Sequence, residues 1–185
     1  CIRDRYYAKQ DAEKLSGKGD TSQKLTLMKT SADSLKKSAD ALNDSSLWEK
    51  KKIKKKDEKT GEEIEVEDYD WDKITKAVKS FVEDYNDVVK EAGESNTKDV
   101  LRNASWMTGM TDKNSNMLAK IGITIGKGNK LELDEDALKQ ADISSLKTVF
   151  TGYNSFVSKI SQKATGISNA ANRASATYTN NGTYS

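Results

Sequence analysis

The sequence contains no histidine and no proline, and its one cysteine is Cys1. Histidine is the commonest general base at neutral pH and the commonest zinc ligand, so its absence argues against most hydrolases and metalloenzymes. A single cysteine cannot form a disulfide framework. No apolar run approaches the roughly 20 residues that a helix needs to cross a bilayer. We therefore predict a protein that is not an enzyme, holds no cofactor or metal, and does not insert into a membrane.

The charges nearly cancel, with 31 Lys and Arg residues against 29 Asp and Glu residues and a net charge of +2. Such a chain has no large electric field to attract nucleic acid, so we expect no nucleic-acid partner. Apolar residues make up 35% and charged residues 32% of the 185 positions. In globular domains, apolar residues average roughly 45–50% and charged residues about 25%. This composition favours thin helical layers in one domain over a thick core.

The two ends differ from the middle of the chain. Residues 1–5 match the translation of TGT-ATA-AGA-GAC-AGR, the end of a transposase sequencing adapter, and we expect them to be non-native. The alternative is an ordinary helix start with a free cysteine. Residues 175–185 are Ser, Thr, Asn, Ala, Gly and Tyr without an apolar stripe, and we expect a flexible tail. The predicted helical domain spans residues 6–174.

A clear helical pattern lies between Thr21 and Asn43. Its apolar positions recur at steps of three and four and are Leu25, Met28, Ala32, Leu35, Ala39 and Leu42. This spacing places them on one stripe of an amphipathic helix. Residues 6–15 are also compatible with a helix, and we interpret residues 17–20 as a turn or hinge between the two.

Residues 47–71 predict a β-hairpin inserted between helices. Six lysines between positions 50 and 56 precede the turn at residues 57–61, and five acidic residues between positions 62 and 68 follow it. Ile53 then falls on the same face as Ile64 and Val66. The expected cross-strand pairs are Lys50 with Glu67, Lys52 with Glu65 and Lys54 with Glu63. The lysine run alone is also compatible with a nucleic-acid patch, but the matching acidic residues favour a solvated, charge-paired hairpin.

The most regular helix follows the hairpin. Asp70 or Asp72 can cap it, Gly93 ends it, and its stripe is Ile74, Val78, Phe81, Tyr85, Val88 and Ala92. Shorter helices are expected over residues 97–107, capped by Thr97, and over residues 112–120. Their inward-facing residues are expected to be Val100, Leu101, Ala104, Met107, Met117 and Leu118. We interpret their Met and Trp side chains as core rather than as a cofactor site.

Residues 121–133 predict a second hairpin, because two short apolar segments flank Gly126–Asn129. Asp134 can cap a short helix through Ala141, and a further segment from Ser144 carries Leu146, Val149 and Phe150. The last helix is expected to carry Tyr153, Phe156, Val157, Ile160, Ala164, Ile167 and Ala171. The predicted fold is mainly α, an elongated antiparallel helical bundle or rod with two small β-hairpins.

Two segments partly match ligand-binding motifs but lack residues that those motifs need. Gly122–Gly128 has three residues instead of four between its first two glycines, and a glycine where a phosphate-binding loop has Ser or Thr. Asp134–Asp136 is not followed by the glycine and glutamate of a calcium loop. The acidic residues lie on expected polar faces, where a carboxyl is not desolvated enough to act as an acid. The sequence shows no catalytic, cofactor-binding or metal-binding site.

The second half resembles the C-terminal region of flagellar hook-associated protein 2, which caps the flagellar filament. The residues that carry the resemblance are Phe81–Asn86, Ile121–Thr124, Leu131–Leu138, Ala141 and Val149–Phe150, in this order within residues 72–173. Members of that family usually carry a large β-rich insert between their helical arms. Here only the hairpin of residues 47–71 stands in that place, so the chain is either the cap itself or a shorter relative.

The resemblance implies a structural role outside the cell, in which the protein guides flagellin subunits into place at the filament tip. Its implied partners are further copies of itself and flagellin or other flagellar subunits. The alternative is a secreted helical adhesin or adaptor module. We also expect the chain to be mostly monomeric by itself, and to need sequence on the N-terminal side of Tyr6 for oligomers or flagellin binding.

Two sets of residues are candidate contact surfaces. Helix-packing contacts are expected between Leu35, Ala39 and Leu42 on one side and Phe81, Tyr85 and Val88 on the other. The two stripes match in character, and a reversing hairpin joins them. The final helix has no obvious partner in the sequence and thins toward small residues. Its candidate assembly face is Ile160, Ala164, Ile167 and Ala171.

Overall fold

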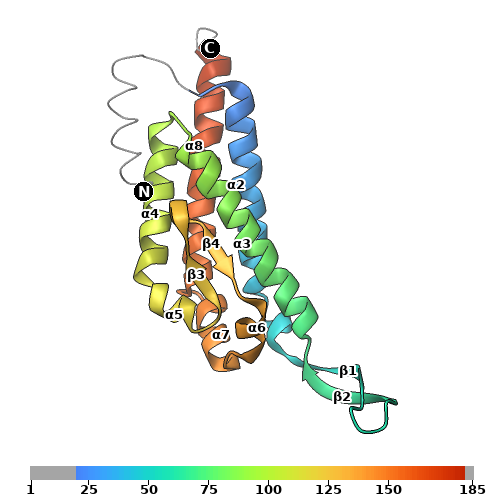
Figure 1. Ribbon diagram of the computed structural model, residues 1–185. Coiled ribbons are helices and arrows are strands. Elements are labelled where there is room, and N and C mark those ends of the chain that lie inside the picture. Colours follow the sequence, from blue (N-terminus) through green and yellow to red (C-terminus); the bar gives the residue numbers. More distant parts are fainter. Residues whose placement is uncertain (1–19, 182–185) are drawn as a thin grey trace.

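The computed structural model describes residues 20–181, with side chains through residue 176. Its long helices are α2 (Ser22–Leu42), α3 (Trp71–Gly93), α4 (Lys98–Lys113) and α8 (Phe156–Asn181). They run in alternating directions along one rod (Figure 1). The predicted fold class, mainly α with two small antiparallel hairpins, is confirmed. The expected adapter residues 1–5 and the expected helix at residues 6–15 lie outside the described residues.

Helix α2 follows directly from its sequence pattern. The Thr21 side-chain oxygen accepts a hydrogen bond from the Lys24 amide at 3.2 Å and caps the first turn. The buried residues of α2, each 0–1% exposed, are Leu25, Met28, Ala32, Leu35, Ala39 and Leu42. They recur every three or four positions, so they form one stripe, and α2 packs against both α3 and α8.

A short 3-10 turn, Ser45–Trp48, leads from α2 into the first hairpin, made of β1 (Lys50–Lys56) and β2 (Glu63–Tyr69). The hairpin projects from one end of the rod (Figure 1). Ile53 lies opposite Val66, on the predicted face.

The predicted register of this hairpin is wrong by two residues. The structure pairs Lys52 with Glu67, Lys54 with Glu65 and Lys56 with Glu63. The Asp57 amide donates to the Glu62 carbonyl at 2.8 Å, so the ladder continues further toward the loop than the sequence pattern predicted. Since side chains alternate with a period of two, a shift of two residues keeps every side chain on its predicted face.

Helix α3 begins and ends where the sequence predicted. Asp70 is its cap and accepts a hydrogen bond from the Lys73 amide at 3.1 Å, and the helix ends at Gly93.

The next helix, α4, is longer than predicted. Thr108 and Thr111 are polar but buried, which extends the inward face beyond Met107. Helix α5 (Ser115–Ala119) is correspondingly short.

Trp106 on α4 corrects one interpretation. Its side chain is 53% exposed, so it does not belong to the core. The Lys163 Nζ of α8 lies 4.8 Å from the centre of its ring, a distance at which a cation is attracted to an aromatic face.

The second hairpin pairs β3 (Ile123–Ile125) with β4 (Leu131–Leu133) around a 3-10 turn, Lys127–Asn129. Asp134 caps α6 (Glu135–Gln140), accepting hydrogen bonds from the amides of residues 136 and 137 at 3.1 Å. Gly122 has a φ of 91°, and a Cβ there would lie 2.7 Å from the Asp134 carbonyl oxygen, so the position requires glycine. Helix α7 (Ile143–Phe150) follows, near the end of the rod from which the first hairpin projects (Figure 1).

Helix α8 starts later and ends later than predicted. Tyr153, which was predicted to lie in this helix, precedes it and is 85% exposed. The chain turns there through Gly152, whose φ is 105°. Residues 175–181, the first part of the predicted tail, belong to α8, and the rest of that tail lies outside the described residues. Ala174 still packs against the core, and the sequence has no glycine or proline between Ala174 and Gly182.

Aromatic side chains join the helices in the core. Phe81 is 0% exposed, and its ring centre lies 6.2 Å from Tyr85, 6.4 Å from Phe150 and 6.3 Å from Phe156. The ring of Trp48 stacks on Phe150 at 5.7 Å. These contacts tie α3 to α7, α8 and the 3-10 turn before the first hairpin, so the hairpin leaves the rod from a rigid base.

Candidate functional site

The structure places all six predicted helix-packing residues in the core. Leu35, Ala39 and Leu42 on α2 and Phe81, Tyr85 and Val88 on α3 are each 0–1% exposed. Helices α2 and α3 pack against each other. The pairing of individual residues across this contact stays a prediction. The Tyr85 hydroxyl donates to Thr111 Oγ1 at 2.8 Å, and burial raises the pKa of Tyr85, so this phenol is a neutral core group at physiological pH.

The expectation that the last helix has no partner in the chain is corrected. Helix α8 packs against α2 and α4 along the rod. Its candidate assembly residues Ile160, Ala164, Ile167 and Ala171 are 0–1% exposed, because they face these helices. Small residues on α8 let neighbouring helices approach closely, and they serve packing within the chain. In the structure this stripe is not open to a second subunit.

Serine–aspartate hydrogen bonds link α8 to α2. Ser168 donates to Asp33 at 2.6 Å, and Ser161 donates to Asp40 at 2.8 Å. The two serines are seven residues apart on α8, and the two aspartates are seven residues apart on α2. Seven residues make about two helical turns, so the hydrogen bonds repeat along one antiparallel seam. Burial raises the pKa of Asp33, but hydrogen bonds from Lys29 and Ser168 lower it more, and the net pKa lies below the ordinary value. This seam was not predicted from the sequence, although the two aspartates and the two serines have the same spacing of seven residues.

A buried carboxylate closes the opposite end of the rod from the hairpin. Asp20 is 2% exposed and accepts hydrogen bonds from Ser95 Oγ at 2.6 Å, the Asn96 amide at 2.7 Å and the Thr97 hydroxyl at 2.5 Å. Burial raises the pKa of Asp20, but these hydrogen bonds and the Lys24 charge lower it more, so the net pKa is depressed. Thr97 begins α4 as predicted, yet its hydroxyl binds Asp20 and does not cap the helix.

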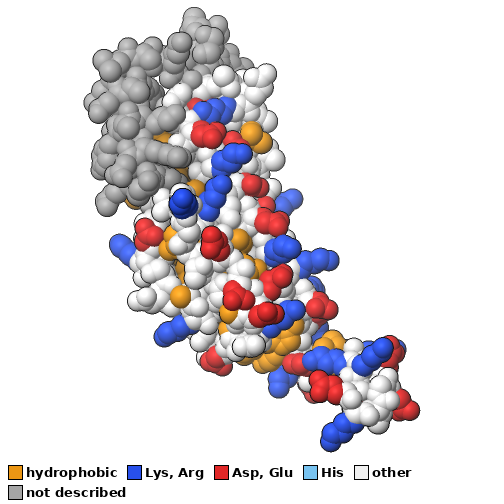
Figure 2. Space-filling model, in the orientation of Figure 1, with side chains coloured by type: hydrophobic (Ala, Val, Ile, Leu, Met, Phe, Trp, Pro, Cys, Tyr) orange, Lys and Arg blue, Asp and Glu red, His pale blue; other side chains and the backbone are white. Residues whose placement is uncertain are grey.

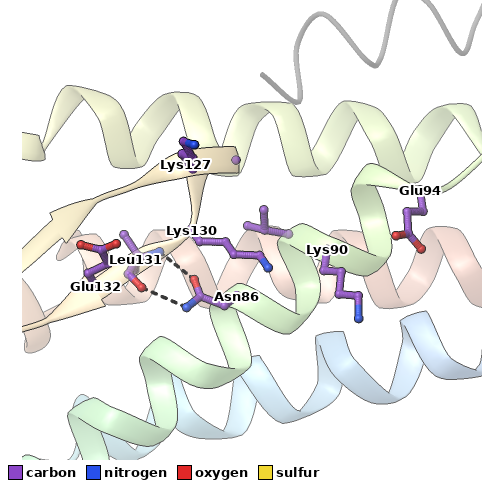
Figure 3. Close-up of a pocket in the computed structure, with 9 residues that line it drawn as sticks. Asn86, Lys90, Glu94, Lys127, Lys130, Leu131 and Glu132 are labelled. Atoms are coloured by element: carbon purple, nitrogen blue, oxygen red, sulfur yellow. Dashed lines mark hydrogen bonds between the residues drawn. The ribbon is translucent and has the colours of Figure 1, made fainter.

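Asn86 joins the second hairpin to α3. Its Oδ1 accepts a hydrogen bond from the Leu131 amide at 2.7 Å, and its Nδ2 donates to the Leu131 carbonyl at 3.0 Å (Figure 3). The side chain thus binds the edge of β4 as a neighbouring strand would. Beside it lies an open groove of about 620 Å³, whose charged lining residues are Lys90, Glu94, Lys127, Lys130 and Glu132. Charges of both signs share this groove, so it does not define one class of ligand.

The first hairpin separates its charges by strand. Basic side chains lie on β1 and acidic side chains on β2, and the hairpin shows both colours where it leaves the rod (Figure 2). Lys55 forms an ion pair with Asp68 at 2.6 Å, and the Lys50 Nζ lies 5.7 Å from the centre of the Tyr69 ring. Most hairpin side chains are exposed. It is therefore the part of the described chain best presented to a partner.

The described part of the chain contains no group of three or more His, Cys, Asp or Glu side chains placed to hold a metal ion. No helix within residues 20–181 is both long and apolar enough to cross a membrane. The buried polar groups described above bind one another and the backbone. These hydrogen bonds and ion pairs stabilise the rod, and the exposed side chains are available for contact with other molecules.

Residues 92–184 match the family described as flagellar hook-associated protein 2 C-terminus. The match runs from the end of α3 through α8, and so covers just over half of the 185 residues. It includes the resembling segments in the second hairpin, α6 and α7, whereas Phe81–Asn86 lies before it. Comparison with curated proteins and with solved structures gives no match.

Proposed function

The chain belongs to the flagellar hook-associated protein 2 family, and from this membership we propose that it acts at the filament tip, where it guides flagellin subunits into place. The family is that of a structural flagellar cap protein. We infer that the protein works outside the cell, and that its partners are copies of itself and flagellin or other flagellar subunits.

One structural observation carries the extension from the matched half to the whole chain. The family match covers α4 to α8, while α2 and α3 lie before it, yet all of these helices share one core. Helix α8 has its largest contact with α2, and serine–aspartate bonds tie the two together. The matched part cannot keep its packing without the preceding helices, so residues 20–91 act in the same function.

The rod suits a role in assembly. An antiparallel bundle whose long helices are tied by buried aromatics and by polar seams resists bending, which a template that positions other subunits requires. Side chains of both charge signs are interspersed over the face shown in Figure 2. Such a surface gives no general attraction to polyanions and leaves recognition to shape and to local charge patterns.

Binding to filaments tests this proposal. Filaments are polymerised from the flagellin whose gene lies nearest to the gene for this chain. They are incubated with the tagged protein and examined by electron microscopy with gold-labelled antibody. We expect label at filament ends and faster incorporation of added flagellin. Label along the filament sides would favour the adaptor alternative. Absence of label at ends and sides alike would refute the proposed function.

A further inference from the structure

The first hairpin has two free edges of opposite charge. It is a sheet of two strands, so within the described residues each strand has a hydrogen-bonded neighbour on one side only. The sequence of β1 is KKKIKKK and that of β2 is EIEVEDY. One edge therefore belongs to a strand with six lysines, and the other to a strand with four acidic residues. Both edges stand clear of the rod (Figure 1).

The register shows which backbone groups point outward along these edges. The Asp57 amide donates to the Glu62 carbonyl, so this pair is hydrogen-bonded within the hairpin. Antiparallel pairs alternate between bonded and non-bonded, and the register is unbroken from the loop to Lys50 and Tyr69. It follows that Lys52, Lys54 and Lys56 turn their amides and carbonyls outward on β1. Their partners Glu67, Glu65 and Glu63 do the same on β2.

We propose that the β1 edge of one copy pairs antiparallel with the β2 edge of a second copy, so that the hairpins of neighbouring subunits form one continuous sheet. This rests on the proposed function, since it names the surface through which copies of the chain meet. In such a sheet, the outward lysines of one copy lie opposite the outward glutamates of the next, as they do within each hairpin.

Charge selects this pairing over the other two. Contact between two β1 edges would set lysines against lysines, and contact between two β2 edges would set acidic residues against acidic residues. Lysines on an edge strand commonly prevent such pairing, and here they prevent it with every edge except an acidic one. The selected contact is heterologous, because it joins different surfaces of the two copies. It therefore leads to a ring or a helical array and not to a closed two-fold dimer.

An apolar strip supports the same arrangement. Ile64 is 41% exposed, although it is a large aliphatic side chain. It shares a face with Ile53 and Val66. Pairing of the β2 edge with a neighbouring β1 edge brings Ile64 and Val66 of one copy beside Ile53 of the next. The contact thus covers apolar surface that the isolated hairpin leaves in water.

Proline substitutions can block one edge at a time. Proline has no amide hydrogen and is tolerated in an edge strand where the amide faces solvent. Lys54→Pro removes an outward donor of β1 and leaves the β2 edge free. Glu65→Pro does the reverse. Amide hydrogen exchange of Ile53 and Ile64, whose amides face the partner strand, verifies that each variant keeps its hairpin. Lys54→Thr is the matched control, because it removes the charge but keeps the amide.

Sedimentation velocity at about 1 mM protein, in about 20 mM and about 500 mM salt, measures the association of copies through this contact. We expect the parent chain, although mostly monomeric in dilute solution, to associate at this high concentration in low salt and to become monomeric in high salt. The control should associate more weakly than the parent. Each proline variant should be monomeric alone, while an equimolar mixture of the two should form dimers that do not grow further.

Three results would overturn the inference: a monomeric parent at low salt, a proline variant that associates like the parent, or self-dimers of a single proline variant. The last would reveal contact between like edges. The filament assay on the same proteins separates this inference from the proposed function. If the parent binds filament ends but does not associate through the hairpin, only the edge pairing fails. If it binds no filament, the proposed function fails whatever the hairpin does.

Discussion

Replacing Phe81 with alanine removes a ring that three other aromatic rings surround. Phe81 is 0% exposed, and the rings of Phe150 and Phe156 meet it edge-on at 6.4 and 6.3 Å. Losing the burial of such a side chain costs about 1.5–3 kcal/mol. The cavity adds to this, and measured Phe→Ala costs in cores are about 3–5 kcal/mol. Each edge-on aromatic contact is worth about 0.5–1.5 kcal/mol beyond its area. We therefore expect a loss of about 4–5 kcal/mol.

The assay is urea unfolding followed by circular dichroism, analysed for the free energy of unfolding and its slope with urea. The slope should stay unchanged, because the variant exposes nearly the same surface on unfolding. Tyr153→Ala is the matched control, since Tyr153 is an aromatic residue with 85% exposure. It should change stability by less than about 0.5 kcal/mol. A loss below about 1 kcal/mol for Phe81→Ala would refute the reasoning that this ring joins α3 to α7 and α8.

Three further predictions concern the hairpin, the buried carboxylate and two glycines. Changing Lys52 and Lys54 to Glu places like charges opposite Glu67 and Glu65. The hairpin amides should then exchange faster, while the helical circular dichroism signal stays constant. A loss of helicity would show that the hairpin is part of the core. Asp20→Asn should cost about 2–3 kcal/mol at pH 7, because it removes charged hydrogen bonds. Folding lowers the Asp20 pKa, so the stabilisation by Asp20 is complete above the unfolded pKa of about 3.9 and is lost as pH falls through the folded pKa. The free energy of unfolding should therefore fall less steeply with acid in the variant than in the parent. Equal slopes in the two proteins would contradict this. Gly122→Ala should lower the free energy of unfolding by more than about 2 kcal/mol in thermal unfolding, through backbone strain and a clash with a carbonyl. Gly109→Ala, by contrast, should stabilise α4 by up to about 1 kcal/mol. Equal effects of the two substitutions would exclude the positive φ of Gly122 as the cause.

Local patterns predicted the elements of this protein well, because each depends on neighbours in the sequence. The three-and-four spacing of α2 and α3 identified the buried stripe of each helix. Asp70 and Asp134 marked helix starts, since a capping side chain binds amides only a few residues ahead. The family resemblance also lay in local segments, and the family match supports it.

The sequence by itself determined the helical class, the two hairpins and the faces of their strands, because side-chain periodicity is a property of each segment alone. Only the tertiary structure decided which stripes meet. Helix α8 packs on α2 across more than a hundred intervening residues, so no local spacing marks Ile160 or Ala164 as core instead of an outer face. The buried state of Asp20 likewise depends on the distant loop that holds Ser95 and Thr97. A carboxylate stabilises the fold only when folding brings hydrogen-bond donors to it and removes the surrounding water. These donors come from a distant segment, so no single position in the sequence marks the interaction.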